Sequence, residues 1–255
     1  MRIVILGTGN LATQLGMAFH AQHAEIIQVY GRSGACASDL ANLLGCIFTT
    51  SKLEISTDAD LYILAVSEAA ITEVLSDAPI RNRLIVHTSG SISIDILATF
   101  SNNYGVFYPL QTLSKQKAVD FSAVPICIEA NSAENLEKLS RLAKTISDQV
   151  FEIDSTQRRQ LHLAAVFVCN FVNHFYAIGE KLLQEQKLDY NLIKPLILET
   201  ASKATLFSPP EVQTGPAVRE NQTIMKQHLK MLEQHPEWQE LYALISKDIS
   251  RFHQV

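Results

Sequence analysis

A glycine-rich stretch near the start of the chain, Gly7-Thr8-Gly9-Asn10-Leu11-Ala12, follows an apolar run and opens a helical pattern over residues 11–21. Its spacing, G-x-G-x-x-A, is informative in this position, between a strand and a helix. Gly7 permits the tight turn, Gly9 lets the backbone approach a pyrophosphate, and Ala12 allows close packing of helix on strand. The first N–H groups of the helix then face the phosphates. The stretch predicts a dinucleotide-binding turn, with a plain tight turn as the alternative.

The acid that many such chains carry after the second strand is missing. NAD-binding sites place Asp or Glu about 20 residues beyond the glycines, where it binds the ribose 2′-hydroxyl. Here Gly31-Arg32-Ser33 follow the apolar run 25–30. Arg32 can pair with a 2′-phosphate through its planar fork of donors, and Ser33 can add a hydroxyl. The turn therefore favours NADP(H) over NAD(H), with a solvated turn arginine as the alternative.

Short apolar runs alternate with helical patterns through the first part of the chain. The candidate strands are residues 3–6, 25–30, 46–49, 61–66, 84–87, 105–108, 125–129 and 149–153, and the helical patterns between them cover 11–21, 35–44, 69–75 and 133–147. This alternation predicts a parallel sheet with both faces covered. The predicted fold class is an α/β dinucleotide-binding domain over residues 1–154, followed by an all-α domain over residues 155–255.

The second part of the chain carries helical patterns only. Residues 156–186 predict one long helix, followed by helices at 190–207, 219–233 and 236–251. The long helix is apolar over much of its circumference and needs cover on several sides. A helical domain of roughly 100 residues supplies little of that cover by itself. We therefore expect a homodimer formed through the helical domain.

Composition limits the class of protein. The 255 residues are 47% hydrophobic and 18% charged with a net charge of −5, which is globular and argues against general nucleic-acid binding. The four cysteines form no C-x-x-C pair, so we expect no metal site and no disulfide framework. No signal peptide is visible, and polar residues interrupt the apolar stretch 161–178, which suits a buried helix better than a membrane span. The expectation is a soluble, cytoplasmic protein.

Polar residues at other strand ends are further candidates, because ligands bind beyond the carboxyl ends of parallel strands. Val66 and Ser67 should lie along the cofactor. His87 is either an acid–base group or a hydrogen-bonded histidine at a strand end. Ser89 is either a substrate ligand or a cap for the next segment. Tyr108 is either a proton donor or a packed tyrosine.

Three polar residues interrupt the long apolar helix, namely His162, Asn170 and Asn173. Eleven residues separate His162 from Asn173, which in a regular α-helix directs both side chains within roughly 20° of each other. Because buried amides need partners, these groups either face the cofactor cleft or bond across an interface. Arg219, in the loop 214–221, either binds an anionic substrate or is a surface arginine.

Four further motifs carry a resemblance to a known family: HTSGS (87–91), FYPLQTLS (107–114), HLAAVFVCNF (162–171) and TGPAVREN (214–221). With the glycine turn and Gly31-Arg32-Ser33, essentially the whole chain resembles the Rossmann-like NADP oxidoreductases with a 6-phosphogluconate-dehydrogenase-like C-terminal domain. Relatives include pyrroline-5-carboxylate reductase, F420-dependent NADP oxidoreductase, prephenate dehydrogenase and the β-hydroxyacid dehydrogenases. The resemblance transfers specific roles only to the glycine turn and to Arg32-Ser33.

The usual proton-transfer groups of these relatives are absent. The long helix resembles that of the β-hydroxyacid dehydrogenases, which carries a K-x-x-x-N pattern. In this sequence Asn170 matches the asparagine, but Val166 takes the place of the lysine. Prephenate dehydrogenases have a histidine before a proline similar to Pro109, and here the residue is Tyr108. Either another residue substitutes, with His87, His162 and Tyr108 as candidates, or the chain binds NADP(H) without strong dehydrogenase activity.

The resulting prediction is an NADP(H)-dependent oxidoreductase that transfers hydride to or from a small, anionic carbonyl, imine or hydroxy compound between its two domains. The alternatives are a non-catalytic NADP(H)-binding regulatory module and a dimeric scaffold. The cofactor-binding candidates are Gly7, Thr8, Gly9, Asn10, Leu11, Ala12, Arg32, Ser33, Val66 and Ser67. The catalytic candidates are His87, His162 and Asn170, and the substrate-binding candidates are Ser89, Asn173 and Arg219.

Overall fold

The computed structural model describes residues 1–253 and divides into two compact units, one of Met1–His174 and one that starts at Phe175. The strands of the first unit are β1 (Arg2–Leu6), β2 (Glu25–Tyr30), β3 (Ile47–Thr49), β4 (Leu61–Leu64), β5 (Leu84–His87), β6 (Asn103–Pro109), β7 (Ile126–Ala130) and β8 (Val150–Glu152). Its helices before the long one are α1 (Asn10–Ala21), α2 (Gly34–Leu44), α3 (Ile71–Ser76) and α4 (Ala133–Ala143), with short 3-10 helices η1 (Lys52–Glu54), η2 (Glu68–Ala70), η3 (Ile94–Leu97) and η4 (Phe121–Ala123).

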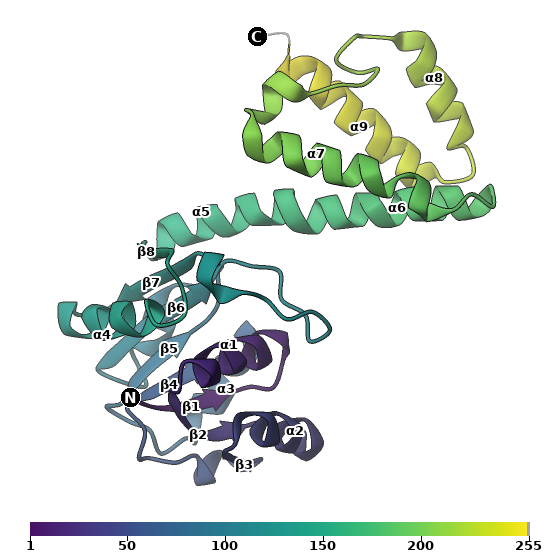
Figure 1. Ribbon diagram of the computed structural model, residues 1–255. Coiled ribbons are helices and arrows are strands. Elements are labelled where there is room, and N and C mark those ends of the chain that lie inside the picture. The colour runs from purple at the N-terminus through teal and green to yellow at the C-terminus, as the bar shows by residue number, and fades with distance from the viewer. Residues whose placement is uncertain (254–255) are drawn as a thin grey trace. The chain divides into compact units, whose positions relative to one another are not determined.

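The strands form one eight-stranded sheet in the order β3-β2-β1-β4-β5-β6-β7-β8 (Figure 1). The order reverses between β1 and β4, which creates a crevice for ligands beyond the carboxyl ends of these two strands. Neighbouring strands are parallel except β6 and β7, which are antiparallel. The α/β fold is confirmed, and the sheet is parallel as predicted except for the pair β6–β7. No α-helix connects β6 to β7 in the described chain, and without a crossover the returning strand pairs antiparallel.

Both faces of the sheet are buried, as nearly unbroken apolar strands require. In β1, Ile3 and Ile5 lie in one hydrophobic cluster with Phe19 of α1. Val4 and Leu6 belong to a second cluster, which includes residues of β4 and α3. Successive side chains of a strand point to opposite faces, so β1 contributes to both clusters and is anchored at the centre of the sheet.

The predicted long helix runs from Ser155 to Glu185 as α5 (Ser155–Ala165), the π-helix η5 (Val166–Phe171) and α6 (Val172–Glu185). The π-helical segment was not predicted. Because a π-turn holds one more residue than an α-turn, the residues after it are rotated by roughly 100° relative to a regular α-helix. The expected alignment of His162 with Asn173 is therefore wrong.

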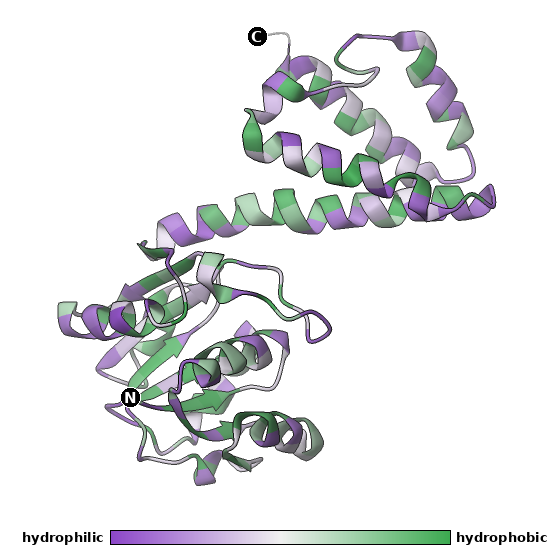
Figure 2. Cartoon of the chain, viewed as in Figure 1, coloured by the Kyte–Doolittle hydropathy of each residue, from purple (hydrophilic) through white to green (hydrophobic). Residues whose placement is uncertain are grey.

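This 31-residue helix is also long and apolar enough to cross a membrane, since its most apolar 18-residue window has a mean hydropathy of 1.5, and it is the one such helix among the described residues. Length and composition alone are weak evidence, since the core helix of a soluble protein passes the same test. Figure 2 shows the hydrophobic positions along it. None of its most apolar window is buried within the described chain, so the expected burial is not met by one copy alone.

The second unit continues with η6 (Tyr190–Leu192), α7 (Lys194–Leu206), η7 (Pro209–Val212), α8 (Gln222–Met231) and α9 (Pro236–Phe252). Prolines near the starts of α7 and α9 are pre-organised for the first helical turn. Asn221 caps α8 by accepting a hydrogen bond from the backbone N–H of Ile224. The last strand ends at Glu152 and α5 begins at Ser155, next to the predicted domain boundary, although α5 groups with the sheet.

Candidate functional site

The glycine turn lies between β1 and α1 at the carboxyl end of the sheet. Gly7 has a φ of 131°, and a Cβ on it would lie 2.2 Å from the carbonyl oxygen of Ala65. Both observations require glycine here. In contrast, a Cβ on Gly9 would have no atom within 4 Å, so this face of the turn is open. The turn is closed toward the sheet and open above it, as the approach of a pyrophosphate requires.

The N-terminus of α1 adds free donors to this open face. Gly9 is the N-cap, and within the described chain no side chain caps the helix. The first N–H groups, in Asn10 and Leu11, are therefore available to an anion. Ala12 is fully buried, as the expected close packing of α1 on the strand requires. A cavity of about 320 Å³ adjoins the turn, and its lining includes Gly7, Thr8, Gly9, Arg32, Ser33, Val66 and Ser67.

Arg32 and Ser33 follow β2 on the rim of the same cavity, and both are exposed. Ser33 caps α2, because its hydroxyl accepts a hydrogen bond from the N–H of Cys36 at 3.4 Å. The exposed guanidinium of Arg32, beside the N-terminus of α2, suits a phosphate. The residues present therefore fit NADP, whose pyrophosphate α1 would hold and whose 2′-phosphate Arg32 would hold.

A second group of polar side chains lies at the ends of β4, β5 and β6. The hydroxyl of Tyr108 lies 3.1 Å from Nδ1 of His162, and we name these two residues the Tyr–His pair. A Cβ on Gly90 would lie 2.7 Å from that nitrogen and 2.8 Å from Cζ of Tyr108, so the loop after β5 touches both rings. Burial raises the pKa of Tyr108, which keeps the phenol protonated at neutral pH.

The same loop binds a carboxylate. Glu68, at the start of η2, accepts hydrogen bonds from the hydroxyls of Ser89 and Ser91. These bonds, that of Ser89 first, hold the pKa of Glu68 below its usual value. Glu68 directly follows Ser67, which lines the dinucleotide cavity. The carboxylate thus lies between that cavity and the loop that touches the Tyr–His pair.

His87 does not fit a catalytic role, because its side chain is fully buried. Its Nδ1 accepts a hydrogen bond from the N–H of Ser89 at 3.2 Å, and its Nε2 has no hydrogen-bond partner within the described chain. Burial, with a contribution from the charge of Arg158, lowers the pKa of His87 to about 4. A neutral, enclosed imidazole that bonds the loop favours the second of the two roles expected for His87, a hydrogen-bonded histidine at a strand end.

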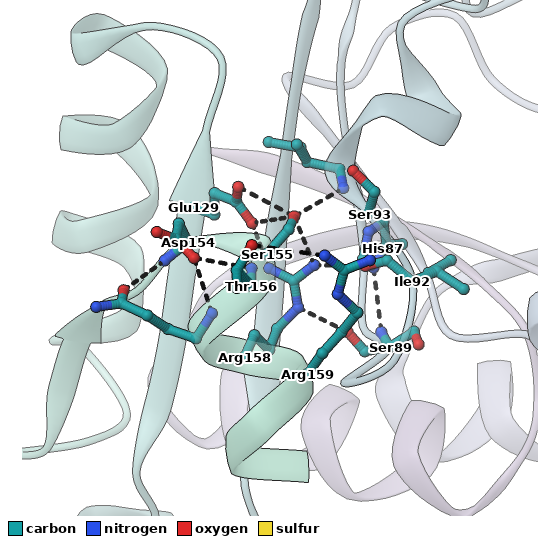
Figure 3. A network of polar contacts seen from close by, with 12 residues as sticks. His87, Ser89, Ile92, Ser93, Glu129, Asp154, Ser155, Thr156, Arg158 and Arg159 are labelled. Carbon is teal, nitrogen blue, oxygen red and sulfur yellow. Dashed lines mark hydrogen bonds and ion pairs between the residues drawn. The ribbon is translucent and has the colours of Figure 1, made fainter. Parts of the chain in front are cut away.

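A buried arginine, missed in the sequence, fastens this loop to α5 (Figure 3). Arg158 is fully buried and forms an ion pair with Glu129 of β7. Its guanidinium donates to the carbonyl oxygens of Ser89 at 3.1 Å and Ile92 at 2.6 Å. Ser155 completes the network, accepting from Arg158 and donating to Glu129. The network fixes the loop against the helix that carries His162.

The remaining candidates from the sequence are Asn170, Asn173 and Arg219. Asn170 is exposed in η5 and Asn173 is exposed in α6, and within the described chain neither forms a hydrogen bond with the pair. Arg219 is exposed in the loop before α8, in the second unit. The described residues contain no group of three or more His, Cys, Asp or Glu side chains that could hold a metal ion.

The chain is similar in sequence to known families and solved structures. A family model described as NADP oxidoreductase, coenzyme F420-dependent, matches residues 2–99, and a domain of unknown function, DUF2520, matches residues 124–249. A Bacteroides fragilis protein described as a "putative NADP oxidoreductase" is 41% identical, over 98% of each chain, with a TM-score of 0.93. The chain belongs to this NADP oxidoreductase family.

Other solved structures share the fold of this NADP oxidoreductase family at lower identity. A Thermotoga maritima protein is 20% identical over 98% of this chain and 99% of its own, with a TM-score of 0.79. An imine reductase from Myxococcus stipitatus, in complex with NADP⁺, is 14% identical over 99% and 96%, with a TM-score of 0.70. No curated protein matches the sequence. The family supports NADP as cofactor and a Rossmann-like domain followed by a helical region.

Proposed function

We propose that this member of the NADP oxidoreductase family is an active reductase or dehydrogenase that acts on a small carbonyl, imine or hydroxy compound. The observation that carries the proposal is the Tyr–His pair, held at the carboxyl end of the sheet that also holds the dinucleotide cavity. Bound NADPH would supply hydride from its nicotinamide ring. The chain itself must then provide orientation and a proton.

Tyr108 is the proposed proton donor. Its hydroxyl keeps its proton at neutral pH because burial raises its pKa, and His162 lies 3.1 Å away to return a proton afterwards. The hydrogen bonds of Ser89 and Ser91, and to a smaller extent the nearby His162, hold the pKa of Glu68 below its usual value, so a carboxylate charge lies close to the pair. The Tyr–His pair would transfer the proton that a lysine or a histidine transfers in the relatives. The earlier candidate His162 thereby becomes the partner of the donor.

The polar candidates outside the Tyr–His pair also have proposed roles. Asn170 and Asn173 are proposed to bond polar groups along the long helix, and Arg219 is proposed to bind a carboxylate of the substrate. We also propose that the protein is a cytoplasmic homodimer, because the second unit and the long helix expose apolar side chains such as Phe167, Leu196 and Leu206.

The test is consumption of NADPH, followed by absorbance, against a panel of small ketones, aldehydes and imines. We expect turnover with wild type and its loss in Tyr108→Phe. The matched control is Tyr242→Phe, since Tyr242 also bonds a histidine, His228, at 2.8 Å in the second unit. Tight NADPH binding without turnover on any member of the panel would favour the regulatory module, and no binding would favour the scaffold.

A further inference from the structure

A buried glutamine on α1 is hydrogen-bonded to the backbone of the loop that follows β6. The Nε2 of Gln14 donates to the carbonyl oxygens of Ser114 at 2.6 Å and Lys117 at 3.0 Å. Its Oε1 accepts a hydrogen bond from the N–H of Val119 at 3.4 Å. A glutamine amide carries two donor hydrogens and one acceptor oxygen, so the whole group is directed at this loop. Gln14 therefore ties the loop to the helix that begins at the glycine turn.

The tied loop covers residues 110–120, between the end of β6 and the start of η4. It begins two residues after Tyr108, the proposed proton donor, and the described chain forms no helix or strand within it. Leu113 and Val119 pack against the hydrophobic cluster beneath, whereas residues 115–118 are exposed. A loop with so few buried contacts opens easily unless polar ties fix it.

Packing contributes little where Gln14 holds the loop. A cavity of about 300 Å³ lies between α1 and the last part of the loop. Its lining includes Gln14 and Met17 of the helix, and Ala118, Val119 and Asp120 of the loop. Atoms that face a cavity lose their van der Waals partners on that side. The hydrogen bonds of Gln14 therefore hold helix and loop together here.

Helix α1 connects this loop to the dinucleotide turn. The first N–H groups of the helix have no side-chain cap in the described chain and are available to an anion. Five residues after Gln14, the ring of Phe19 packs against that of Phe107 on β6, with the centroids 5.6 Å apart. The helix thus contacts β6 in the core and the loop beyond it. An anion at its uncapped start stabilises its first turns, and Gln14 lies in the second of them.

We propose that Gln14 is a positioning residue for the Tyr–His pair. It holds the loop 110–120 beside Tyr108, and NADPH bound at the start of α1 fastens the loop further through the same helix. The inference rests on the proposed function, because it concerns the surroundings of the proposed donor. Gln14 acts through backbone groups of the loop, so its loss should displace the site and leave the chemical groups of the site in place.

A purely structural role is the rival explanation, and Gln28 on β2 provides the matched control. Gln14 and Gln28 are both 3% exposed. The amide of Gln28 also bonds backbone groups, donating to the carbonyl oxygen of Glu54 at 3.0 Å and accepting from the N–H of Ser56 at 2.7 Å. Those groups lie between β3, at the edge of the sheet, and β4, away from the loop 110–120. Residue type, burial and kind of partner are therefore the same, and only the tied segment differs.

The first test is limited proteolysis of the full chain by trypsin, with the cuts after the exposed Lys115 and Lys117 followed by mass spectrometry. We expect saturating NADPH to slow these cuts by about 10-fold in wild type, since binding to the closed form lowers the population of the open form. Gln14→Leu should be cut rapidly with or without NADPH, although calorimetry should show that it still binds NADPH. Gln28→Leu should behave as wild type at both positions.

Turnover supplies the second readout. On the best substrate of the panel, kcat should fall by about 10- to 100-fold in Gln14→Leu, because a small displacement of a reaction site has effects of this size. The dissociation constant of NADPH should stay close to that of wild type, since the glycine turn is unchanged. Gln14→Asn keeps the amide but is one methylene group shorter. It should show the same losses to a smaller degree, and it replaces Gln14→Leu if that variant does not fold.

Three results would overturn the inference. The first is a wild-type loop that trypsin cuts equally fast with and without NADPH. The second is a Gln14→Leu variant that keeps both the protection by NADPH and the wild-type kcat. The third is a Gln28→Leu variant with the same losses, which would make the effect a general one of buried amides. Absence of turnover in wild type contradicts the proposed function instead, and the proteolysis then decides the inference by itself.

Discussion

The hydroxyl of Tyr108 at the end of β6 lies 3.1 Å from Nδ1 of His162 on α5, although 54 residues separate them in sequence. The two side chains meet because Arg158, one turn before His162, is buried against Glu129 and the loop after β5. A structural network therefore positions a pair of chemically active groups. It gives the proposed proton donor a fixed position in a chain that lacks the lysine and histidine of its relatives.

Replacement of Tyr108 by phenylalanine should remove that donor. We expect kcat to fall by about 100-fold or more, with the dissociation constant of NADPH unchanged, because the ring still packs and only the hydroxyl is lost. His162→Gln should lower kcat less, because the phenol of Tyr108 remains. Steady-state kinetics over pH 5–9, with Tyr242→Phe as control, test both variants. Unchanged kcat in Tyr108→Phe would exclude it as the donor.

Gly7 and Gly9 should respond differently to alanine. Gly7→Ala places a methyl group against the backbone at Ala65 and strains a residue at positive φ, so we expect a loss of at least about 1–3 kcal/mol in the free energy of unfolding. Gly9→Ala meets no atom within 4 Å, so its stability should be nearly unchanged while NADPH binding weakens. Urea denaturation and calorimetry measure the two effects. Equal loss of stability would show that the turn is not open above Gly9.

The buried His87 should make the protein less stable in mild acid. Its pKa is about 4 in the folded state and 6.5 in the unfolded state, so the unfolded chain binds more protons between these values. Stability therefore falls as the pH decreases through this window, by about 2 kcal/mol from pH 7 to pH 5. His87→Asn should reduce that pH dependence, whatever its effect on absolute stability. An identical change with pH in wild type and variant would show that His87 does not cause it.

Exposed apolar side chains should direct the pairing of two copies. On α7, Leu196 and Leu198 have exposed fractions of 65% and 71%. Large exposed apolar surfaces of this kind mark interaction sites. We expect light scattering to give the mass of a dimer, and Leu198→Lys to shift the equilibrium toward the monomer. The control is Met231→Lys, which places the same charge at an exposed apolar position of another helix, α8. A strictly monomeric wild type would contradict the expectation.

The strands of the sheet and the glycine turn after β1 could be predicted from the sequence. Nearly unbroken apolar strands fit only a sheet covered on both faces, and the glycine spacing has a direct backbone meaning at Gly7. The direction of β7 was not predictable, because an apolar run has the same pattern in either orientation. The π-helical segment was missed as well, since the periodicity of a long apolar helix does not reveal one inserted residue.

The candidate site was harder to predict, because its members come together only in three dimensions. The sequence could not decide whether His87 is an acid–base group or a hydrogen-bonded histidine, whereas the structure shows that it is completely enclosed. Nothing in the sequence singled out Arg158, and only the position of Glu129 on β7 makes its burial tolerable. Glu68 stood next to a predicted cofactor residue, but its serine partners lie more than 20 residues away in sequence.

The affinity for NADPH against NADH tests the central claim most directly. By calorimetry we expect wild type to bind NADPH more tightly, and Arg32→Ala to weaken NADPH binding by roughly 10- to 100-fold with little effect on NADH, because hydrogen bonds to charged groups contribute about 1.5–3 kcal/mol. Arg81→Ala, another exposed arginine, should leave both affinities unchanged. Equal affinity of wild type for the two cofactors, or an Arg32→Ala variant that still prefers NADPH, would contradict the account.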